Sequence, residues 1–160
     1  MYDSIRPYNI AERRRIQKAS VRYETHLENI LDLLSARGIS EETARYHHLG
    51  YIDNDPIPGH ENYNQCITIP YMYPTWGGPA EIRKMRFRCS LQHDCKTHNH
   101  PKYLTPAGDT GSIYNMAAMA NPAAEMHICE GEFDSMILEQ CGWSAVALSL
   151  IHISDGAREA

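Results

Sequence analysis

No run of apolar residues in this 160-residue sequence approaches the roughly 18 to 20 residues of a membrane-spanning helix. The N-terminal MYDSIRPYNIAERRR also lacks the apolar centre of a secretory signal peptide. With 42% hydrophobic and 22% charged residues, the composition is globular rather than disordered. These features predict a soluble, cytoplasmic protein of one ordinary domain or two small ones, without a membrane partner.

A net positive charge is also missing, since the formal charge is -5 and the sequence pI is near 6.0. No global field therefore draws the protein to nucleic acid, and a polyanion would need a local basic patch. The five cysteines are an odd number and are scattered, which favours free thiols or a metal site over a disulfide framework. There is no internal repeat and no low-complexity segment.

The N-terminal part has the pattern of helices. Apolar residues recur at spacings of three and four between Ala11 and Leu34, which predicts one helix with a buried stripe. Its cations form either a solvated face or a nucleic-acid contact; they are Arg13, Arg14, Arg15, Lys18 and Arg22. Gly38 is placed to end this helix and Ser40 to begin a shorter one. The DNDPIPGHENYN that follows is turn chemistry, its Asp53 to Asp55 included.

Two strands are predicted next, CITIPYMY and IRKMRFRC, joined by the turn PTWGGPA. In the second strand Lys84, Arg86 and Arg88 alternate with apolar residues, and a period of two places all three cations on one face. Like charges in a row repel, so the face requires an anion or acidic neighbours. Phosphate binding and a plain solvated face are both open. After a short extended piece, IYNMAAMA is expected to be helical.

A strand, a helix and a strand end the readable sequence, in EMHICE, EFDSMILEQC and WSAVAL. Such a unit has parallel strands, and functional groups gather at their carboxyl ends. Glu130 occupies such an end, Gly131 allows a turn into the helix, and Glu132 and Asp134 fall in its first turn. Three carboxylates in five residues suit Mg²⁺, although the last two acids can equally serve the helix dipole alone.

The loop CSLQHDCKTHNH contains five thiol or imidazole side chains in twelve residues. Four of them would close a tetrahedral zinc site, and Cys89, Cys95 and His100 are the expected Zn²⁺ ligands. The alternative is a polar loop with a half-buried thiol, because the Cys-x₅-Cys spacing is not that of a standard zinc knuckle.

ICEGEFDSMILEQCGWSAVAL resembles the first half of a Toprim domain, the metal-binding unit of bacterial-type primases, topoisomerases, some nucleases and recombination mediators. The family's E-G-x-x-D motif maps onto Glu130, Gly131 and Asp134. Three upstream segments resemble bacterial-type primases in the same order: LLSARGISEETARYHHLGYI, ITIPYMYPTWGGPAEIRKMRFRC and PKYLTPAGDTGSIYN. The resemblance covers most of Leu33 to Leu148 and is closest to the Toprim DNA primases of tailed phages.

The resemblance implies an α+β fold: an N-terminal helical region (1–60), the small mixed or antiparallel sheet of a primase catalytic core (61–125), and the first βαβ unit of an incomplete Toprim domain (126–148). It also implies synthesis of short RNA primers from ribonucleoside triphosphates on single-stranded DNA, in bacterial host cytoplasm, with a replicative helicase as a partner. The alternative is a Toprim-containing DNA-binding or recombination protein that does not polymerise.

For the site, the resemblance implies that Glu130 binds Mg²⁺ or Mn²⁺, with Asp134 in the same partial site, and assists attack of a 3′-hydroxyl on a triphosphate. Arg88 and Lys102 would hold template or triphosphate phosphates, and Lys84 and Arg86 are weaker candidates for the same task.

Two things expected of that family are missing from these 160 residues: the separate zinc-binding module of primases and the Asp-x-Asp pair after SAVAL. Instead, LSLIHI resembles a translated transposon end used in sequencing libraries, which predicts an adaptor-derived, non-native tail at 149–160 and a longer native reading frame. Without its metal-binding partners Glu130 would hold Mg²⁺ weakly, so this chain is predicted to be inactive, with SAVAL as an exposed edge strand.

Overall fold

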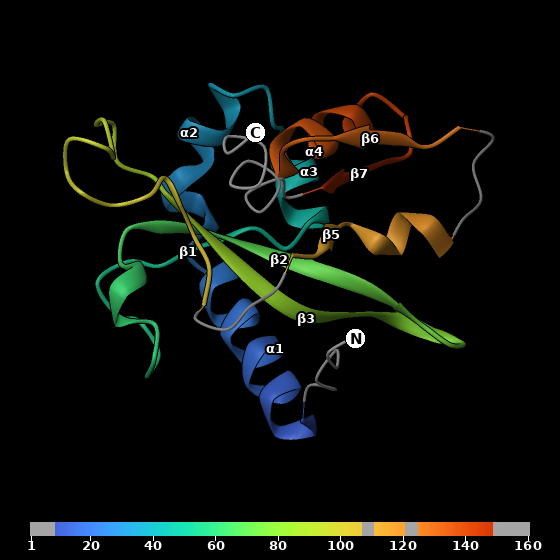
Figure 1. Ribbon diagram of the computed structural model, residues 1–160, viewed down its shortest axis with the longest axis horizontal. Coiled ribbons are helices and arrows are strands. Elements are labelled where there is room, and N and C mark those ends of the chain that lie inside the picture. Colours follow the sequence, from blue (N-terminus) through green and yellow to red (C-terminus); the bar gives the residue numbers. More distant parts are fainter. Residues whose placement is uncertain (1–8, 107–110, 121–124, 149–160) are drawn as a thin grey trace, which may run out of the picture.

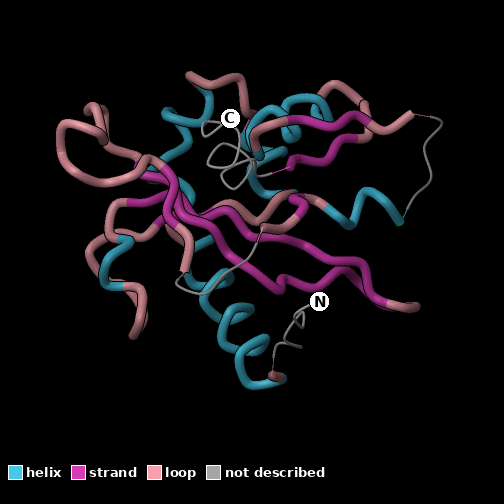
Figure 2. Tube along the Cα trace, viewed as in Figure 1, coloured by secondary structure: helices cyan, strands magenta, loops and turns pink. Residues whose placement is uncertain are grey.

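The computed structural model describes residues 9–106, 111–120 and 125–148. The tail predicted at 149–160 lies outside the described residues. The helices are α1 (Ile10–Glu24), α2 (Leu31–Ser35), α3 (Glu41–Tyr46) and α4 (Glu132–Gln140), with 3₁₀ turns at Leu27–Ile30, Glu61–Tyr63 and Met116–Ala120. The strands are β1 (Gly50–Tyr51), β2 (Cys66–Thr75), β3 (Gly78–Cys89), β4 (Tyr103–Leu104), β5 (Ile113–Tyr114), β6 (His127–Cys129) and β7 (Ala145–Leu148). The predicted α+β class is confirmed, and Figures 1 and 2 show its strands in two groups.

The first sheet is antiparallel throughout, with the order β1-β2-β3-β4, and its long β2–β3 hairpin crosses the molecule in Figure 1. Directly opposed residues share a face of a sheet. The pairing of Ile67 with Arg88 and of Ile69 with Arg86 therefore places apolar β2 side chains beside the cations of β3. The opposite face of β3 carries Phe87, which is fully buried in the core cluster formed with α1. Both faces of the second half of β3 are thus covered, whereas its first four residues are exposed.

The single helix predicted over Ala11–Leu34 is wrong, because α1 ends at Glu24 and a 3₁₀ turn separates it from α2. The apolar positions were read correctly, but they serve two different core clusters. Tyr23 packs with the α1 side of β3, whereas Leu27 and Leu34 pack on the other cluster. The chain must turn between them, and the Thr25 hydroxyl closes α1 by donating to the Arg22 carbonyl at 2.6 Å.

Strand β1 passes very close to the end of α1. A Cβ atom on Gly50 would lie 2.5 Å from the carbonyl carbon of Tyr23, which is too close for any side chain. Glycine at this position is therefore what allows β1 to join the sheet. The short helix predicted after Ser40 is confirmed as α3, whose first turn receives the Ser40 hydroxyl as a cap at 3.1 Å.

The second sheet has the order β5-β7-β6, and β6 and β7 are parallel across α4, as the strand–helix–strand pattern predicts. The expectation that the last strand is an exposed edge is wrong. Strand β5 pairs antiparallel with β7 from the other side, so β7 is central and Val146 is only 4% exposed. The helix predicted for IYNMAAMA is wrong in its first two residues, which form β5, and the rest is a 3₁₀ turn.

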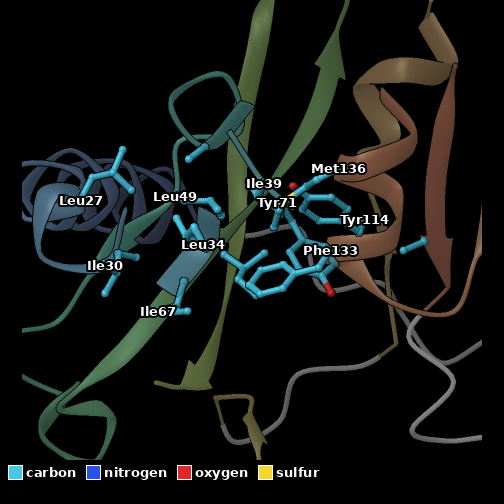
Figure 3. Close-up of a cluster of buried hydrophobic side chains, with 13 residues drawn as sticks. Leu27, Ile30, Leu34, Ile39, Leu49, Ile67, Tyr71, Tyr114, Phe133 and Met136 are labelled. Carbon is cyan, nitrogen blue, oxygen red and sulfur yellow. The ribbon is translucent and has the colours of Figure 1, made fainter. Parts of the chain in front are cut away.

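One hydrophobic cluster joins the N-terminal helices, the hairpin and the second sheet (Figure 3). It contains Leu34 of α2, Tyr71 of β2, Tyr114 of β5, and Phe133 and Met136 of α4. Burying a side chain of this size contributes roughly 1.5–3 kcal/mol. The packing fixes α4 against the face of β3 that carries the cations. None of the helices within 9–106, 111–120 and 125–148 is long and apolar enough to span a membrane.

Candidate functional site

The cations of β3 are buried, so the interpretation of their face as a solvated one is wrong. Lys84, Arg86 and Arg88 are 6%, 4% and 3% exposed. Taking an isolated cation out of water costs several kcal/mol unless a counter-charge or hydrogen bonds compensate. The surroundings of each cation therefore show what it can do, and the three surroundings differ.

Arg86 is neutralised by Glu132, the first residue of α4. Its Nη1 lies 2.5 Å from Glu132 Oε1, and the Tyr71 hydroxyl donates to the same oxygen at 2.6 Å. Burial opposes the charge on Arg86, but Glu132 and the Tyr71 oxygen together outweigh burial and hold the pKa of Arg86 above its ordinary value. Burial, and then Glu132, raise the pKa of Tyr71, which keeps the phenol as a donor. Glu132 is therefore an internal counter-ion and not a ligand for an external metal.

This role of Glu132 was missed from the sequence, where it was assigned to a metal cluster or to the helix dipole. A signal was present. Glu132 lies one turn before Met136, and both are almost completely buried, 2% and 0% exposed. An acid on the apolar stripe of a helix requires a partner across the interface, and the alternating cations of β3 were the available candidates.

Arg88 has no such counter-ion, since the residues described provide no carboxylate within ion-pair distance of it. Its guanidinium lies over two aromatic rings, with Cζ 4.8 Å from the centroid of Phe133 and 5.3 Å from that of Tyr103. Burial, reinforced by the nearby Arg37, lowers the pKa of Arg88. Tyr103 partly offsets this by favouring the charged guanidinium, and the two rings hold the side chain in place. A guanidinium has five N–H donors, more than these contacts use.

Arg88 opens onto a cleft of about 420 Å³ whose walls also carry Lys102 and Arg37. Strand β4 positions Lys102: Tyr103, the next residue, pairs with Arg88, and the Lys102 carbonyl accepts the Cys89 N–H at 2.9 Å. The structure thus brings Arg88 and Lys102 together. Arg37, in the turn after α2, was missed from the sequence, although it lies in the Arg-Gly-Ile-Ser segment of the resemblance. Three cations around one cleft give it a positive potential, which favours an anion such as phosphate.

Lys84 lies elsewhere on the same strand. Its Nζ is 3.1 Å from the Ser112 hydroxyl and 5.4 Å from the centre of the Tyr71 ring. It is not among the residues that line the cleft at Arg88. The structure therefore separates Lys84 from Arg88 and Lys102, and Arg86 does not line that cleft either.

Glu130 directly follows β6, at the carboxyl end of a parallel strand, and its side chain is exposed. Asp134 is also exposed, in the first turn of α4. Gly131 has φ −119° and ψ 150°, which is ordinary extended backbone, so a sharp turn is not why glycine is here. A Cβ atom at Gly131 would lie 2.9 Å from Asp134 Oδ2, so glycine makes room for this carboxylate.

Glu130 and Asp134 have the oxygen ligands that Mg²⁺ prefers, and their exposure leaves room for the waters that this ion retains. Neither lines the cleft at Arg88. The acids are instead connected to the cations along the sequence. Glu132 contacts Arg86, and Phe133 contacts Arg88. These two residues directly follow Glu130 and Gly131. The packing of α4 on β3 thereby fixes where the exposed acids stand.

The cysteine–histidine loop folds as a compact cluster. One ligand atom each from Cys89, His93, Cys95 and His100 lies within 4.8 Å of the other three. The expected ligands Cys89, Cys95 and His100 are brought together, and His93 joins them as a fourth. His98 stacks on His93 with ring centroids 4.3 Å apart but is not part of the group. The cluster also contributes to one wall of the cleft that holds Arg88.

Four cations of α1 line a second cavity of about 620 Å³, and partners are seen for two of these four, which are Arg14, Arg15, Lys18 and Arg22. Arg22 forms an ion pair with Asp55, and Arg15 donates to the carbonyl of Pro58. Both partners lie in the DNDPIPG segment, which was read as a turn. This turn therefore packs against the basic face of α1.

The comparisons with known proteins support one fold. No family model matches the sequence. The Gene 57 protein of Mycobacterium phage D29 is 34% identical over 87 residues, which are 54% of this chain and 53% of that protein. Among solved structures, the DnaG catalytic core has a TM-score of 0.62 at 15% identity, and the match covers 85% of this chain and 53% of that one.

Two further solved structures show the same likeness. The Aquifex aeolicus primase with zinc-binding and RNA polymerase domains has a TM-score of 0.62 at 17% identity, over 90% of this chain and 44% of that one. A DnaG primase catalytic domain bound to single-stranded DNA has a TM-score of 0.61 at 15% identity, over 87% and 56%. The chain spans about half the length of the relatives that it matches. Its described part has the fold of the corresponding part of a primase catalytic core.

Proposed function

We propose that this chain is part of a DNA primase of the bacterial or tailed-phage Toprim type, which makes short RNA primers on a single-stranded DNA template. The fold of a primase catalytic core supports the class of enzyme. The match to a phage protein supports the viral type. In this proposal ribonucleoside triphosphates are the substrates, and a replicative helicase brings the enzyme to its template.

One observation carries the proposal: Arg88 is a buried cation with no carboxylate partner in the described part of the chain, and it faces a cleft shared with Lys102 and Arg37. A guanidinium presents paired donors that match two phosphate oxygens, and a charge-assisted hydrogen bond of this kind is among the strongest available to a protein. Template or triphosphate phosphates would supply the counter-charge that the protein withholds. Arg86, which Glu132 neutralises, positions α4 and does not bind substrate.

The exposed acids complete the proposal. Glu130 and Asp134 would hold Mg²⁺ or Mn²⁺, whose chemistry is to neutralise charge on the phosphates during nucleotidyl transfer. Two carboxylates form only part of such a site. We propose that further acids come from a longer form of the protein, so that the 160-residue chain binds nucleic acid but does not polymerise.

The binding half of the proposal is tested by fluorescence anisotropy of labelled single-stranded DNA, using the present chain. Arg88→Gln should weaken binding about 10- to 100-fold, since hydrogen bonds to charged groups are worth roughly 1.5–3 kcal/mol. Arg83→Gln is the matched control, because Arg83 lies on the same strand, interacts with Glu81 and does not line the cleft. Unchanged binding by Arg88→Gln would exclude the cleft as the phosphate site.

The catalytic half is tested by ribonucleotide incorporation on a single-stranded template, using the longer reading frame. Glu130→Gln should abolish incorporation and leave template binding intact. If the longer protein binds DNA but incorporates no ribonucleotide, the polymerase assignment fails, and a Toprim-containing DNA-binding or recombination protein is the better description.

A further inference from the structure

The loop between β3 and β4 has very little apolar packing of its own. It runs from Ser90 to Pro101, and its one large aliphatic residue, Leu91, is 45% exposed. In contrast, the two thiols at its base are buried, with Cys89 9% and Cys95 8% exposed. A loop that turns its sulfur atoms inward and its aliphatic side chain outward is not stabilised by a hydrophobic core.

The imidazoles of the loop point their nitrogens at the same place as the thiols. Nε2 of His93 is 2.9 Å from Nε2 of His100 and 3.6 Å from Sγ of Cys89. Nδ1 of His100 lies 3.1 Å from the carbonyl oxygen of Pro101. A ring N–H that donates to a backbone carbonyl leaves the other nitrogen with a free lone pair, which is the usual arrangement behind a metal-binding histidine.

The spacing of these atoms suits zinc. Bond lengths of about 2.3 Å to sulfur and about 2.0–2.1 Å to nitrogen place tetrahedral ligands roughly 3.6 Å (S to N) and 3.3 Å (N to N) apart. The sulfur-to-nitrogen distance already has this value. The two imidazoles need to separate by only about 0.4 Å, which small rotations of these half-buried side chains supply.

We propose that Cys89, His93, Cys95 and His100 bind one Zn²⁺ in a closed tetrahedral site. All four positions are filled by the protein, so no place remains for a reactive water and the site is structural. Two thiolates balance the charge of the ion, which therefore adds no net charge to the neighbouring cleft. The metal replaces the missing core of the loop and links its two ends.

The zinc site lies next to the cleft and would fix the positions of its cations, an inference that rests on the proposed function. Cys89 directly follows Arg88, and Lys102 comes two residues after His100. A metal that joins Cys89 to His100 therefore fixes both phosphate-binding side chains relative to one another. Without it, the spacing of Arg88 and Lys102 depends on the short pairing of β4 with the end of β3.

The test is the metal content of the 160-residue chain, produced with a tag that contains no histidine and purified under reducing conditions. Elemental analysis should find one zinc per chain. After chelation, Co²⁺ should restore a single site with the d–d bands of tetrahedral cobalt and a thiolate charge-transfer band. Cys95→Ser and His100→Asn should each lower zinc content at least several-fold and remove the cobalt spectrum.

The matched controls are His98→Asn in the same loop and Cys141→Ser, an exposed thiol elsewhere. Both should keep one zinc per chain. A zinc content near zero in the unmodified chain, a Cys89–Cys95 disulfide in freshly reduced protein, or the same metal content in Cys95→Ser would each overturn the proposal. Circular dichroism of the chelated chain shows whether it remains folded, and the cobalt titration reports the site even where folding depends on metal.

Zinc content and DNA binding separate this proposal from the proposed function. Loss of zinc in His100→Asn with weaker DNA binding supports both. One zinc per chain with no DNA binding in the unmodified protein leaves the metal site standing and removes the primase-type cleft.

Discussion

The buried pair of Arg86 and Glu132 offers a sharp test of how α4 is held. Glu132→Gln keeps the size of the side chain and an oxygen that accepts from Arg86 and from the Tyr71 hydroxyl, but it removes the negative charge. Arg86 then stays buried as a cation without its counter-ion. Both side chains are at most 5% exposed, so solvent cannot replace the missing charge without opening the interface between α4 and β3.

The expected loss follows from this burial. Removing one partner of a buried ion pair costs about 3–5 kcal/mol. The Tyr103 ring, whose centroid is 4.7 Å from the Arg86 guanidinium, offsets roughly 0.5–2 kcal/mol of that cost, and the remaining amide contacts offset a little more. We expect Glu132→Gln to lower the free energy of unfolding by about 2–3 kcal/mol, a large share of the 5–15 kcal/mol typical of a domain.

Urea unfolding followed by circular dichroism measures this loss. Arg86→Met in the Glu132→Gln background should restore much of it, since the double variant buries no charge at this position. Asp134→Asn is the matched control: it removes an exposed acid from the same helix turn and should cost only the dipole contribution, about 0.3–1 kcal/mol. If Glu132→Gln costs no more than Asp134→Asn, the pair is not the buried contact that fixes α4.

Two further predictions concern α1 and its neighbours. The Tyr23 hydroxyl accepts the Ile57 N–H and also shares a hydrogen bond with Nδ1 of His60. Burial, followed by Arg15, lowers the pKa of His60. As pH falls, the unfolded chain therefore binds a proton at His60 before the folded chain does. The free energy of unfolding should fall as pH drops through about 6.5, by at most about 1.4 kcal/mol per pH unit. Urea midpoints measured from pH 8 to 5 should show this slope, and His60→Asn should flatten it. Gly50→Ala should lower the free energy of unfolding by about 1–3 kcal/mol or more, because the new Cβ would meet the Tyr23 backbone at 2.5 Å. Gly77→Ala is the control: no atom lies near its Cβ, so it should be destabilised only by the strain of its positive φ. Equal thermal midpoints for the two variants would contradict the close approach at Gly50.

Periodicity in the sequence was enough to predict most elements, but it could not say what each face would meet. The alternation in β3 correctly placed its cations on one face. Whether that face was solvated depended on α4, which lies more than forty residues later in the chain and packs against it. The break between α1 and α2 had the same origin, because one continuous apolar stripe was shared between two clusters that only the tertiary fold separates.

The candidate site shows the same division. Residue type and local spacing identified the thiols and imidazoles that gather in the loop, because their separation in sequence is short. Glu132 was misassigned, because an acid in a first helical turn is well explained by the helix dipole alone. Its partner across the interface could be found only by asking which acid lies on the buried stripe of α4. Burial, more than residue type, decides whether a carboxylate is available to a metal.

Two arginines that are alike in the sequence therefore have opposite roles in the fold. Arg86 and Arg88 are two residues apart on one face of β3 and are nearly equally buried, but Glu132 lies at hydrogen-bond distance from the first alone. The pair with Arg86 fixes the start of α4, and with it the positions of Glu130 ahead of the helix and of Phe133 beneath Arg88. Arg88 is then held by aromatic rings, with no carboxylate partner among the described residues, so in the proposed function its charge is available for binding phosphate.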